Sequence, residues 1–500
     1  MKRLYIYGPP ASGKTTLANS LSARYSITIP DLDALIVERT GCPIPQIFKE
    51  RGEAEFRRIE SETLTTTDAQ AVALGGGTLL RACNRRFAEE NGFVVVLDVD
   101  PETIARRIEA QSGTRPLGNR AAERKVHYAS FAHHVDADTQ ILLPRKPRGK
   151  VAPPPSKSHM HRLLIADFLA GGDAWERATA GECADIEATR RCLGALNAQS
   201  GDLDCGESGS TLRFMAPLAA ALGVKANFIR RGRLADRPMI DYSSLESGRH
   251  ELRGDVSSQF VTGLLFALPL LAGDSEIAFT TPLQSRGYVD MTLDVVRKYG
   301  IEVRETECGF FVPGGQRYKS PGAFEPEGDW SGAAFWYAAN ALGAEVEISG
   351  VCGSSRQPDA VVQKLVSRIV KGEGEIDISG CPDLFPALAV VAAATPRETK
   401  FVNAARLRIK ESDRIEAMEK ALAAFGVGTW STEDSVTVIG TDGPFAPCEI
   451  DSVNDHRIAM AAAIASMRAD GPVLIHGAGC VAKSYPAFFE DLARLQQSQA

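Results

Sequence analysis

Apolar segments of helical length recur along most of the chain. Each is started by small or polar residues and followed by a glycine turn and a strand-like stretch, as in GSTLRFMAPLAAALG, GDWSGAAFWYAANALG and NDHRIAMAAAIAS. Because apolar residues occupy nearly every helical position, these segments predict helices buried on all sides, with sheets around them. Their recurrence beyond about residue 156 indicates internal duplication.

The first 142 residues follow a different pattern, in which short strands alternate with helices. Lys2 to Tyr7 predicts a strand, SITIPD a second strand ending at Asp31, and AVAL a third. A glycine-rich loop, GPPASGKTT, lies between the first strand and the helical LANSLSARY, which is the setting that the motif G-x-x-x-x-G-K-[ST] requires. In such loops backbone N–H groups and a lysine bind phosphates, and a hydroxyl holds Mg²⁺. The residues predicted to bind ATP are Gly8, Gly13, Lys14, Thr15 and Thr16.

Composition narrows the class of protein. A chain of 500 residues is expected to hold about three domains, and 44% hydrophobic and 24% charged residues are globular values. The net charge of -7 gives no support to a nucleic-acid or anionic-membrane partner, and no apolar run reaches the ~18 residues of a membrane span. The ten cysteines lack C-x-x-C spacing and no signal peptide is visible, so a cytoplasmic protein without structural zinc is expected.

Further motifs follow the phosphate loop in order: D-x-D from Asp31, R-T-G from Arg39, G-E-x-x-F-R from Gly52, G-G-G from Gly75 and R-P-L from Arg115. Together they resemble the shikimate kinase family over residues 1–142, which implies a P-loop domain with a parallel sheet flanked by helices. The resemblance implies phosphorylation of shikimate by ATP. The implied ligands are Thr15 and Asp31 for Mg²⁺, Arg115 for ATP, and Asp33, Arg57, Gly75, Gly76, Gly77 and Arg124 for shikimate.

Two departures from that family bear on the kinase activity. Of the family's R-x-P-L-Y motif, this chain keeps only the arginine, Arg124, and the tyrosine, Tyr128. The lid from Arg115 to Arg124 is shorter than the family's pattern. The family's terminal helix is missing, because VDADTQILL runs directly into the next region. An alternative therefore stays open, in which the domain is a degenerate kinase kept as a scaffold or as a nucleotide-sensing module.

Residues 143–155 form a proline-rich, basic junction, LPRKPRGKVAPPP. Proline restricts the backbone, so the composition predicts a stiff connection. Within it, RGKVAPP has strand character and is expected to join the sheet of the C-terminal lobe.

Two glycine- or serine-rich helix starts lie in the second region, at Ser156-Lys157-Ser158 and at Ser208-Gly209-Ser210. Helix starts favour anions, so two of them suggest a ligand with more than one anionic group. Cations recur in similar places further on, in A-D-R-P-M, R-I-K-E-S-D-R-I, N-D-H-R-I-A-M and A-K-S-Y-P. In their order, these motifs resemble the 5-enolpyruvylshikimate-3-phosphate (EPSP) synthase family from about residue 144 to 495.

That resemblance implies an inside-out α/β barrel of repeated βαβαββ units, with one lobe at residues 156–326 and another at 327–500. The active site would lie in the cleft between them. The residues implied to bind shikimate 3-phosphate are Lys157, Ser158, Arg162, Ser257, Ser258, Gln259, Ser285, Tyr288, Asp383 and Lys410. Those implied to bind phosphoenolpyruvate are Lys157, Gly209, Arg237, Gln259, Arg414, Arg457 and Lys483.

The implied reaction transfers an enolpyruvyl group to the 5-hydroxyl of shikimate 3-phosphate and needs no cofactor. Glu411 is expected to move the proton of the methylene carbon, Asp383 to orient the hydroxyl, and Lys157 to stabilise developing charge. Glu207 and Ser210 stand where the family often has Asn and Thr, so sensitivity to glyphosate stays open.

The two halves predict one bifunctional enzyme that carries out consecutive steps of aromatic amino acid biosynthesis on small-molecule substrates. The sequence does not predict an oligomeric state. A rival hypothesis is a non-enzymatic, nucleotide-switched interaction protein. The cations around Asp383 and Glu411 argue against it, because a protein-binding surface has little need of them.

Overall fold

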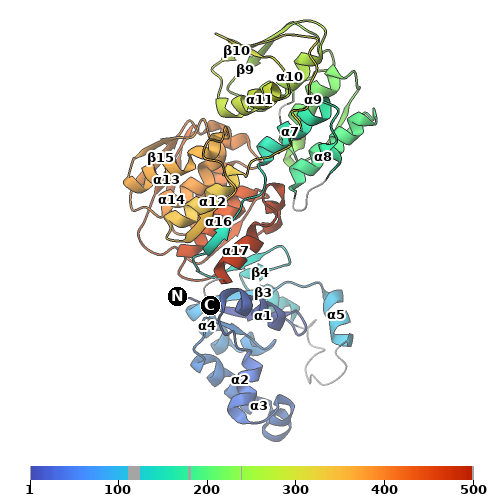
Figure 1. Ribbon diagram of the computed structural model, residues 1–500. Helices are drawn as coiled ribbons and strands as arrows, with labels where there is room; N and C mark the ends of the chain where they lie inside the picture. The colour runs from blue at the N-terminus through green and yellow to red at the C-terminus, as the bar shows by residue number, and fades with distance from the viewer. Residues whose placement is uncertain (1, 111–123, 178–181, 238, 498–500) are drawn as a thin grey trace.

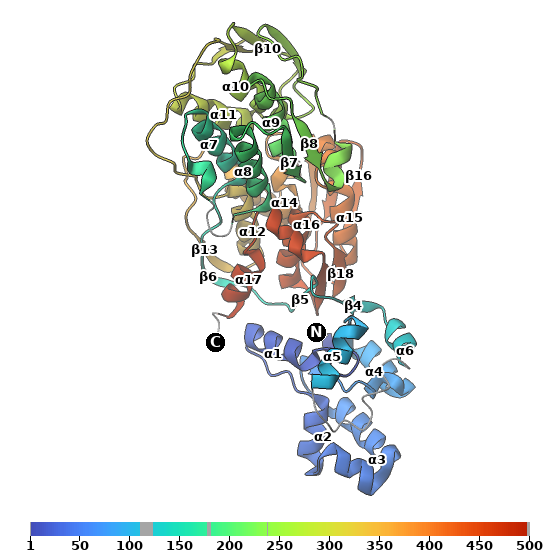
Figure 2. The same cartoon turned by 90° about the vertical axis from the view of Figure 1, so that its right-hand side faces the viewer.

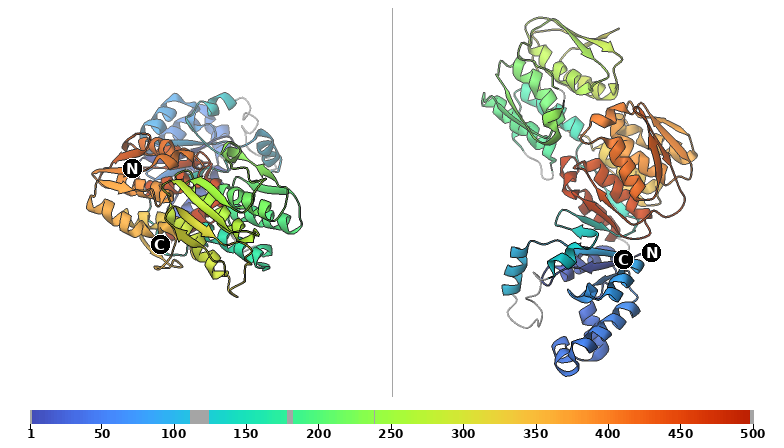
Figure 3. Two further views of the ribbon diagram at one scale, coloured as in Figure 1. Left: turned by 90° about the horizontal axis from the view of Figure 1, so that it is seen from above. Right: turned by 180° about the vertical axis from the view of Figure 1, so that it is seen from behind.

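The computed structural model describes residues 2–110, 124–177, 182–237 and 239–497. Three bodies lie one above another: an N-terminal domain, a lobe built mainly from the C-terminal third of the chain, and a lobe built from the middle third (Figure 1). The described part of the chain begins and ends where the N-terminal domain meets the C-terminal lobe, as the view from behind also shows (Figure 3). No helix in the described ranges is long and apolar enough to cross a membrane.

The N-terminal domain has a parallel four-stranded sheet in the order β2-β1-β3-β4. Its strands are β1 (Arg3–Tyr7), β2 (Ala71–Ala73), β3 (Gly92–Leu97) and β4 (His133–Val135). Its helices are α1 (Lys14–Tyr25), α2 (Leu32–Thr40), α3 (Ile44–Thr66), α4 (Ala82–Asn91), α5 (Pro101–Ala110) and α6 (Lys125–Ala129), with a short 3₁₀ turn η1 (Thr78–Leu80). The predicted strand SITIPD is wrong: only Asp31 pairs, through an isolated parallel bridge to Ala73.

The middle lobe, lobe 1, holds three helices that are buried almost all round, α7 (Lys157–Leu169), α9 (Gly209–Ala221) and α10 (Ser258–Ala267). Around them lie α8 (Ala184–Asn197), α11 (Arg286–Lys298), a two-stranded sheet and a four-stranded sheet ordered β11-β12-β10-β9. The strands are β7 (Asp202–Gly206), β8 (Asn227–Arg230), β9 (Arg249–Arg253), β10 (Ser275–Thr281), β11 (Arg304–Thr306) and β12 (Gly309–Val312).

The C-terminal lobe, lobe 2, repeats this plan around buried α12 (Trp330–Ala341), α14 (Phe385–Ala393) and α16 (His456–Ala465). Its outer helices are α13 (Val362–Lys371), α15 (Arg414–Ala424) and α17 (Phe488–Gln497). Its strands are β13 (Glu345–Ile348), β14 (Glu375–Asp377), β15 (Glu398–Val402), β16 (Gly428–Ser431), β17 (Ser435–Ile439), β18 (Cys448–Asp451) and β19 (Val473–His476). The order β14-β15-β17-β16 matches β9-β10-β12-β11, with one parallel and two antiparallel pairings in each. Both sheets therefore come from a βαβαββ unit, which supports the predicted duplication.

The chain crosses between the lobes twice, at adjacent places. Pro155 forms an antiparallel bridge with Gly328, and Ser156 N–H donates to the Glu327 carbonyl at 2.6 Å. Just beyond each crossing a buried helix begins, α7 in lobe 1 and α12 in lobe 2. The buried helices of both lobes can be followed in the side view (Figure 2).

The junction is built into lobe 2. Strand β6 (Arg148–Val151) pairs in parallel with β13, and β5 (Gln140–Leu142) pairs antiparallel with β19. The boundary expected at residue 142 assigns β5 to the first domain, whereas its hydrogen bonds place it in the sheet of lobe 2. Side chains alternate across a strand, so Ile141 packs into the core of the first domain and Leu142 into that of lobe 2.

Between β4 and α7, a stretch that the structure describes throughout, no helix occurs, and a helix of lobe 2 packs against the first domain. Helix α17 packs against α1, and Arg24 Nε donates to Gln496 Oε1 at 3.1 Å. Leu474 of β19 joins the core cluster of the first domain, and Leu143 N–H donates to the hydroxyl oxygen of Tyr25 at 3.0 Å. The two parts of the chain therefore share a continuous apolar interface.

Candidate active sites

The phosphate loop of the first domain has the conformation that its glycines predict. Gly8 and Gly13 have φ of 144° and 101°, and α1 begins at Lys14, directly after Gly13. Lys14 Nζ donates to the carbonyls of Gly8 and Pro9 at 2.9 and 2.8 Å. The loop, Asp31, Asp33 and Gly75 line one hollow, so the structure brings the predicted phosphate-binding and acid-binding residues together.

The predicted metal ligands lie side by side at this hollow. Thr15 Oγ1 is 3.4 Å from Asp31 Oδ2, and Asp31 also caps α2 through its other oxygen. A hydroxyl and a carboxylate beside a phosphate loop suit Mg²⁺, which usually takes few protein ligands and completes its shell with water and phosphate oxygens.

The predicted shikimate residues gather around the Gly75–Gly77 turn. A Cβ on Gly75 would lie 2.9 Å from Asp33 Oδ1, and one on Gly77 would lie 3.0 Å from Arg57 Nη2 and 3.3 Å from Arg124 Nη1. Glycine is therefore needed for these side chains to approach the backbone. Arg57 is oriented by an ion pair with buried Glu60 at 2.8 Å.

Two further arginines bear on the nucleotide site of this domain, Arg115 and Arg107. Arg115, the predicted lid residue, lies outside the described residues. Arg107 was missed by sequence reasoning: it lies on α5, lines the hollow, and donates to the carbonyls of Ala11 and Ser12 at 3.3 and 3.4 Å. As one arginine of an amphipathic helix, Arg107 carried no sequence signal.

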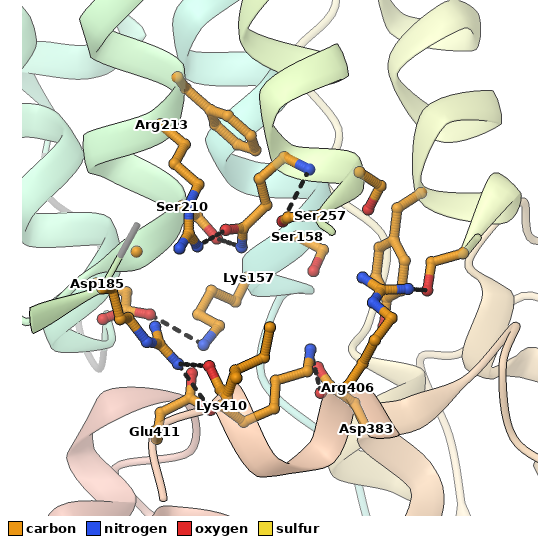
Figure 4. Close-up of a pocket in the computed structure, with 18 of the residues that line it drawn as sticks. Lys157, Ser158, Asp185, Ser210, Arg213, Ser257, Asp383, Arg406, Lys410 and Glu411 are labelled. Atoms are coloured by element: carbon orange, nitrogen blue, oxygen red, sulfur yellow. Dashed lines mark hydrogen bonds and ion pairs between the residues drawn. The ribbon is translucent and has the colours of Figure 1, made fainter. Parts of the chain in front are cut away.

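A second cavity lies between the lobes, where helix starts from both lobes converge (Figure 4). Helices α7, α9 and α10 begin there, with Ser156, Ser208 and Ser257 as their caps. From lobe 2 come the 3₁₀ turns η7 (Pro382–Leu384) and η8 (Ala405–Ile409). The lining residues are Lys157, Ser158, Arg162, Asp185, Gly209, Ser210, Arg213, Phe214, Arg237, Val256, Ser257, Ser258, Gln259, Ser285, Tyr288, Asp383, Arg406, Ile409, Lys410 and Glu411.

Lys157 occupies the middle of this cavity. Its ammonium group pairs with Asp185 at 2.9 Å. Burial would lower the pKa of Lys157, but Asp185 and Glu411 outweigh it and raise the pKa above the ordinary value. Lys157 is therefore a cation that is able to stabilise negative charge on a bound molecule.

Asp383 is held by three cations of lobe 2. It accepts from Arg414 at 2.7 Å, Arg457 at 3.0 Å and Lys410 at 3.2 Å. Burial would raise the pKa of Asp383, but Arg457, Lys410 and Arg414 hold it well below the ordinary range. Its carboxylate is consequently charged and fixed in direction.

Glu411 shares one of those cations. Its Oε2 lies 2.7 Å from Arg414 Nη2 and 3.9 Å from Arg237 Nη2. Burial would raise the pKa of Glu411, but Arg414, Arg237 and Lys157 lower it well below 4.5. Arg414 also pairs with buried Asp455 at 2.9 Å, so this arginine holds three carboxylates.

Replacing Arg414 by methionine is expected to lower the melting temperature of lobe 2 by about 10 °C. Breaking a buried ion pair by removing one partner costs about 3–5 kcal/mol, because a buried charge loses its compensation. Without Arg414, the pKa of Asp455 and Glu411 rises, so protonation at lower pH relieves the cost. The difference in melting temperature between the wild type and Arg414→Met, measured by calorimetry, should thus shrink as the pH falls from 8 to 5. The exposed pair Arg304–Glu302 supplies the control, since Arg304→Met should shift the melting temperature little; a deficit that grows on acidification would contradict the assignment.

Comparison with curated proteins decides the family. The chain is 37% identical over 416 residues to a 3-phosphoshikimate 1-carboxyvinyltransferase of Clostridium perfringens, covering 71% of this chain and 97% of that protein. The corresponding protein of Clostridium kluyveri is 38% identical over 413 residues, with 71% and 96% covered. The chain belongs to the EPSP synthase family. The family model for EPSP synthase (3-phosphoshikimate 1-carboxyvinyltransferase) matches residues 240–492, and that for shikimate kinase matches residues 10–140.

The fold of the EPSP synthase part agrees with a solved structure. An EPSP synthase from Acinetobacter baumannii aligns with a TM-score of 0.58 at 23% identity, covering 71% of this chain and 98% of that one. The predicted fold classes are confirmed, a P-loop domain followed by an inside-out α/β barrel of two lobes. The chain is a bifunctional shikimate-pathway enzyme, a shikimate kinase domain fused to an EPSP synthase.

The residues expected to bind phosphoenolpyruvate are divided between two places. Lys157, Gly209, Arg237 and Gln259 line the main cavity of the EPSP synthase part. Lys483 lies in an adjoining hollow that Arg237 and Glu411 also line. Arg414 and Arg457 do not line either hollow; both are buried behind Asp383, within ion pairs.

Three charged lining residues lay outside the site residues that the sequence predicted: Asp185, Arg213 and Arg406. Arg213 donates to Gln259 Oε1 at 2.5 Å, and burial lowers its pKa to about 10. Arg406 belongs to lobe 2 but donates to Ser285 Oγ of lobe 1 at 2.6 Å. Within the described part of the chain, neither arginine forms an ion pair with a carboxylate.

Proposed function

We propose that the cleft between the lobes binds shikimate 3-phosphate and phosphoenolpyruvate together, and that the P-loop domain supplies the first of them from shikimate and ATP. The observation that carries the proposal is the arrangement around Lys157: two fixed carboxylates, Asp383 and Glu411, lie among cations from both lobes (Figure 4). Two substrates that each bring a phosphate and a carboxylate fit such a site.

The phosphate of shikimate 3-phosphate would lie on the serine-lined side of the cavity. Ser257, Ser258 and Ser285 stand at the starts of α10 and α11, where hydroxyls and backbone N–H groups favour an anion. Arg406 reaches this group from lobe 2 through Ser285. Because its Nε is buried without a hydrogen-bond partner in the described structure, Arg406 has donor capacity left for a phosphate oxygen.

Phosphoenolpyruvate would lie on the other side of Lys157. Gly209 opens α9, and a Cβ there would come within 2.7 Å of Arg237 Nη1, so an arginine and a helix start face the same space. Gln259, held by Arg213 and Ser210, completes that wall. The hollow beside Arg237 leads to Lys483, which would receive a second anionic group.

The reaction is an addition followed by an elimination. The 5-hydroxyl oxygen forms a bond to C2 of phosphoenolpyruvate while the methylene carbon gains a proton; the methyl group then loses a proton, the C2–O bond to phosphate breaks, and the enol ether forms. Glu411 would give and recover the carbon-bound proton, and Asp383 would orient the hydroxyl and accept its proton. Binding of anions beside Arg237 and Lys157 would offset their charge, which raises the low pKa of Glu411 toward the value that proton donation needs.

In the kinase domain, the 3-hydroxyl of shikimate would attack the γ-phosphate of ATP, forming the phosphate ester and releasing ADP. Asp33 and Arg57 would hold shikimate against the glycine turn, and Lys14 would neutralise the transferred phosphate. Thr15 and Asp31 would hold Mg²⁺, which would supply positive charge to offset that of the ATP phosphates.

The test is to incubate the purified chain with shikimate, ATP, Mg²⁺ and phosphoenolpyruvate and to identify products by mass spectrometry. A parallel sample receives shikimate 3-phosphate and no ATP. EPSP in both samples supports both activities. EPSP in the second sample alone would favour the alternative of an inactive kinase domain, and EPSP in neither would overturn the proposal.

Replacing Arg406 by methionine is expected to raise the KM for shikimate 3-phosphate by about 10- to 100-fold, since hydrogen bonds to charged groups contribute about 1.5–3 kcal/mol. The KM for phosphoenolpyruvate should change much less, because Arg406 lies on the serine-lined side. Steady-state kinetics with each substrate varied in turn makes the measurement.

Arg408 is the matched control for this prediction. It lies on the same 3₁₀ turn but pairs with Asp413 at 3.0 Å, outside the cavity. Arg408→Met should keep both KM values near those of the wild type. Equal rises in the two KM values of Arg406→Met would refute a role confined to the phosphate.

A further inference from the structure

The short link between β4 and β5, residues 136–139, lies along a turn of lobe 2. This turn, η10 (Ala478–Lys483), follows β19 and begins after Gly477, which has φ of 65°. Asp138 of this link accepts both of the first N–H groups of η10. Ala478 N–H donates to its carbonyl at 3.0 Å, and Gly479 N–H donates to its Oδ1 at 2.7 Å. A residue from the kinase side thus caps a turn of the EPSP synthase part.

The position of Asp138 is fixed from several directions. Asp136 Oδ1 accepts from the N–H of Asp138 at 3.0 Å and from Thr139 Oγ1 at 2.6 Å, which closes a turn over residues 136–139. Thr139 Oγ1 also lies 3.2 Å from Nδ1 of His476, the last residue of β19. Directly after Thr139, β5 begins to pair with β19. The segment that leaves the first domain after β4 therefore follows the start of η10 and then β19 as one continuous contact.

The close approach depends on glycine at the second position of the turn. A Cβ on Gly479 would lie 2.7 Å from Asp138 Oδ1, which is shorter than real side chains tolerate. The carboxylate reaches the backbone only because that Cβ is absent.

The last residue of η10 is Lys483, whose ammonium group faces the cleft. Its Nζ lies 2.6 Å from Glu207 Oε2 of lobe 1 and 2.8 Å from the carbonyl of Asn454. The side chain is mostly buried and lines the hollow shared with Arg237 and Glu411. A six-residue turn has few hydrogen bonds of its own, so the cap at its start limits how far Lys483 is able to shift.

We infer that Asp138 is a positioning residue for phosphoenolpyruvate binding, through which the kinase half holds Lys483 in place for the EPSP synthase half. The inference rests on the proposed role of Lys483 as a ligand of phosphoenolpyruvate. On this inference the first domain stabilises one wall of the second active site. The fusion then contributes to substrate binding, in addition to keeping the two domains on one chain.

The experiment compares Asp138→Ala with Asp138→Asn in the full-length chain. Alanine removes the acceptor of Gly479 N–H, so the KM for phosphoenolpyruvate should rise about three- to tenfold. The KM for shikimate 3-phosphate and the rate of shikimate phosphorylation should stay within twofold of the wild type. Asparagine keeps an oxygen in the same place and should restore the KM for phosphoenolpyruvate, which a general loss of stability would not allow.

Arg24→Met is the matched control. Arg24 of α1 donates to Gln496 of α17 at 3.1 Å, across the same interface but away from η10. This variant should leave all three parameters unchanged. An unchanged KM for phosphoenolpyruvate in Asp138→Ala, a parallel rise in both KM values, or a failure of asparagine to restore the value would each overturn the inference.

Lys483→Met tests the proposed role of Lys483 in binding phosphoenolpyruvate separately from the inferred role of Asp138. If its KM for phosphoenolpyruvate equals that of the wild type, the proposed role of Lys483 fails and the inference fails with it. If Lys483→Met raises that KM while Asp138→Ala does not, Lys483 keeps its role and only the contribution of the kinase half is refuted.

Discussion

Glu411→Gln is expected to lower the kcat of enolpyruvyl transfer by about 10²- to 10⁴-fold, the range that general acid–base catalysis contributes. Glutamine retains the size of the side chain and an oxygen facing Arg414, but it is unable to give or accept the carbon-bound proton. Both KM values should change far less than kcat, since Lys157, Arg237 and the serine-lined side stay in place.

Two readouts make this prediction specific. Steady-state kinetics gives kcat and KM, and mass spectrometry in ²H₂O follows deuterium entering the methylene group of phosphoenolpyruvate, which requires the proton to move both ways. The control is Glu416→Gln, on the exposed side of α15 and paired with Lys420. A kcat within threefold of the wild type, or undiminished deuterium exchange, would remove Glu411 from the proton transfer.

Lys14→Met is expected to lower the rate of shikimate phosphorylation by about 10³-fold while EPSP formation from supplied shikimate 3-phosphate is retained. The ammonium group of Lys14 lies inside the phosphate loop, 2.9 Å from the carbonyl of Gly8, and stabilises the charge that builds up on the transferred phosphate. Coupled detection of ADP measures the first reaction and release of phosphate measures the second.

The second reaction is an internal control for folding in this experiment, because it is catalysed by the same chain. Lys49→Met, on the exposed face of α3, controls for the loss of a positive charge and should retain both activities. A Lys14→Met variant that phosphorylates shikimate at the wild-type rate would contradict the proposed role of the loop. An inactive wild-type kinase domain would instead support the nucleotide-sensing alternative.

Sequence reasoning worked best where a local motif fixes local geometry. The phosphate loop is one continuous stretch between a strand and a helix, so its conformation was predictable from spacing alone. It failed where long-range pairing decides: SITIPD has strand-like residues, yet only Asp31 finds a partner strand. Strand β5 has the same ambiguity, since its apolar residues serve two cores at once.

Two residues of the cleft that the sequence did not predict, Arg406 and Asp185, were missed for the same reason. Arg406 lies outside the R-I-K-E-S-D-R motif by two positions, and only the fold brings its guanidinium group to Ser285 of the other lobe. Asp185 is one acid in the first turn of an amphipathic helix, a place where acids are common for reasons of helix stability. Neither position carried a signal that a local pattern could reveal.

The pairing of β5 with β19 bears on how the gene could be divided. Cutting the coding sequence directly after β5 would leave β19 as an open sheet edge and uncover Leu474 in one product, while the other would keep β5 as an unpaired strand. Unpaired edges with apolar residues invite aggregation. Separate genes for the two activities would therefore each need a replacement segment, so this fusion is difficult to reverse by simple fission.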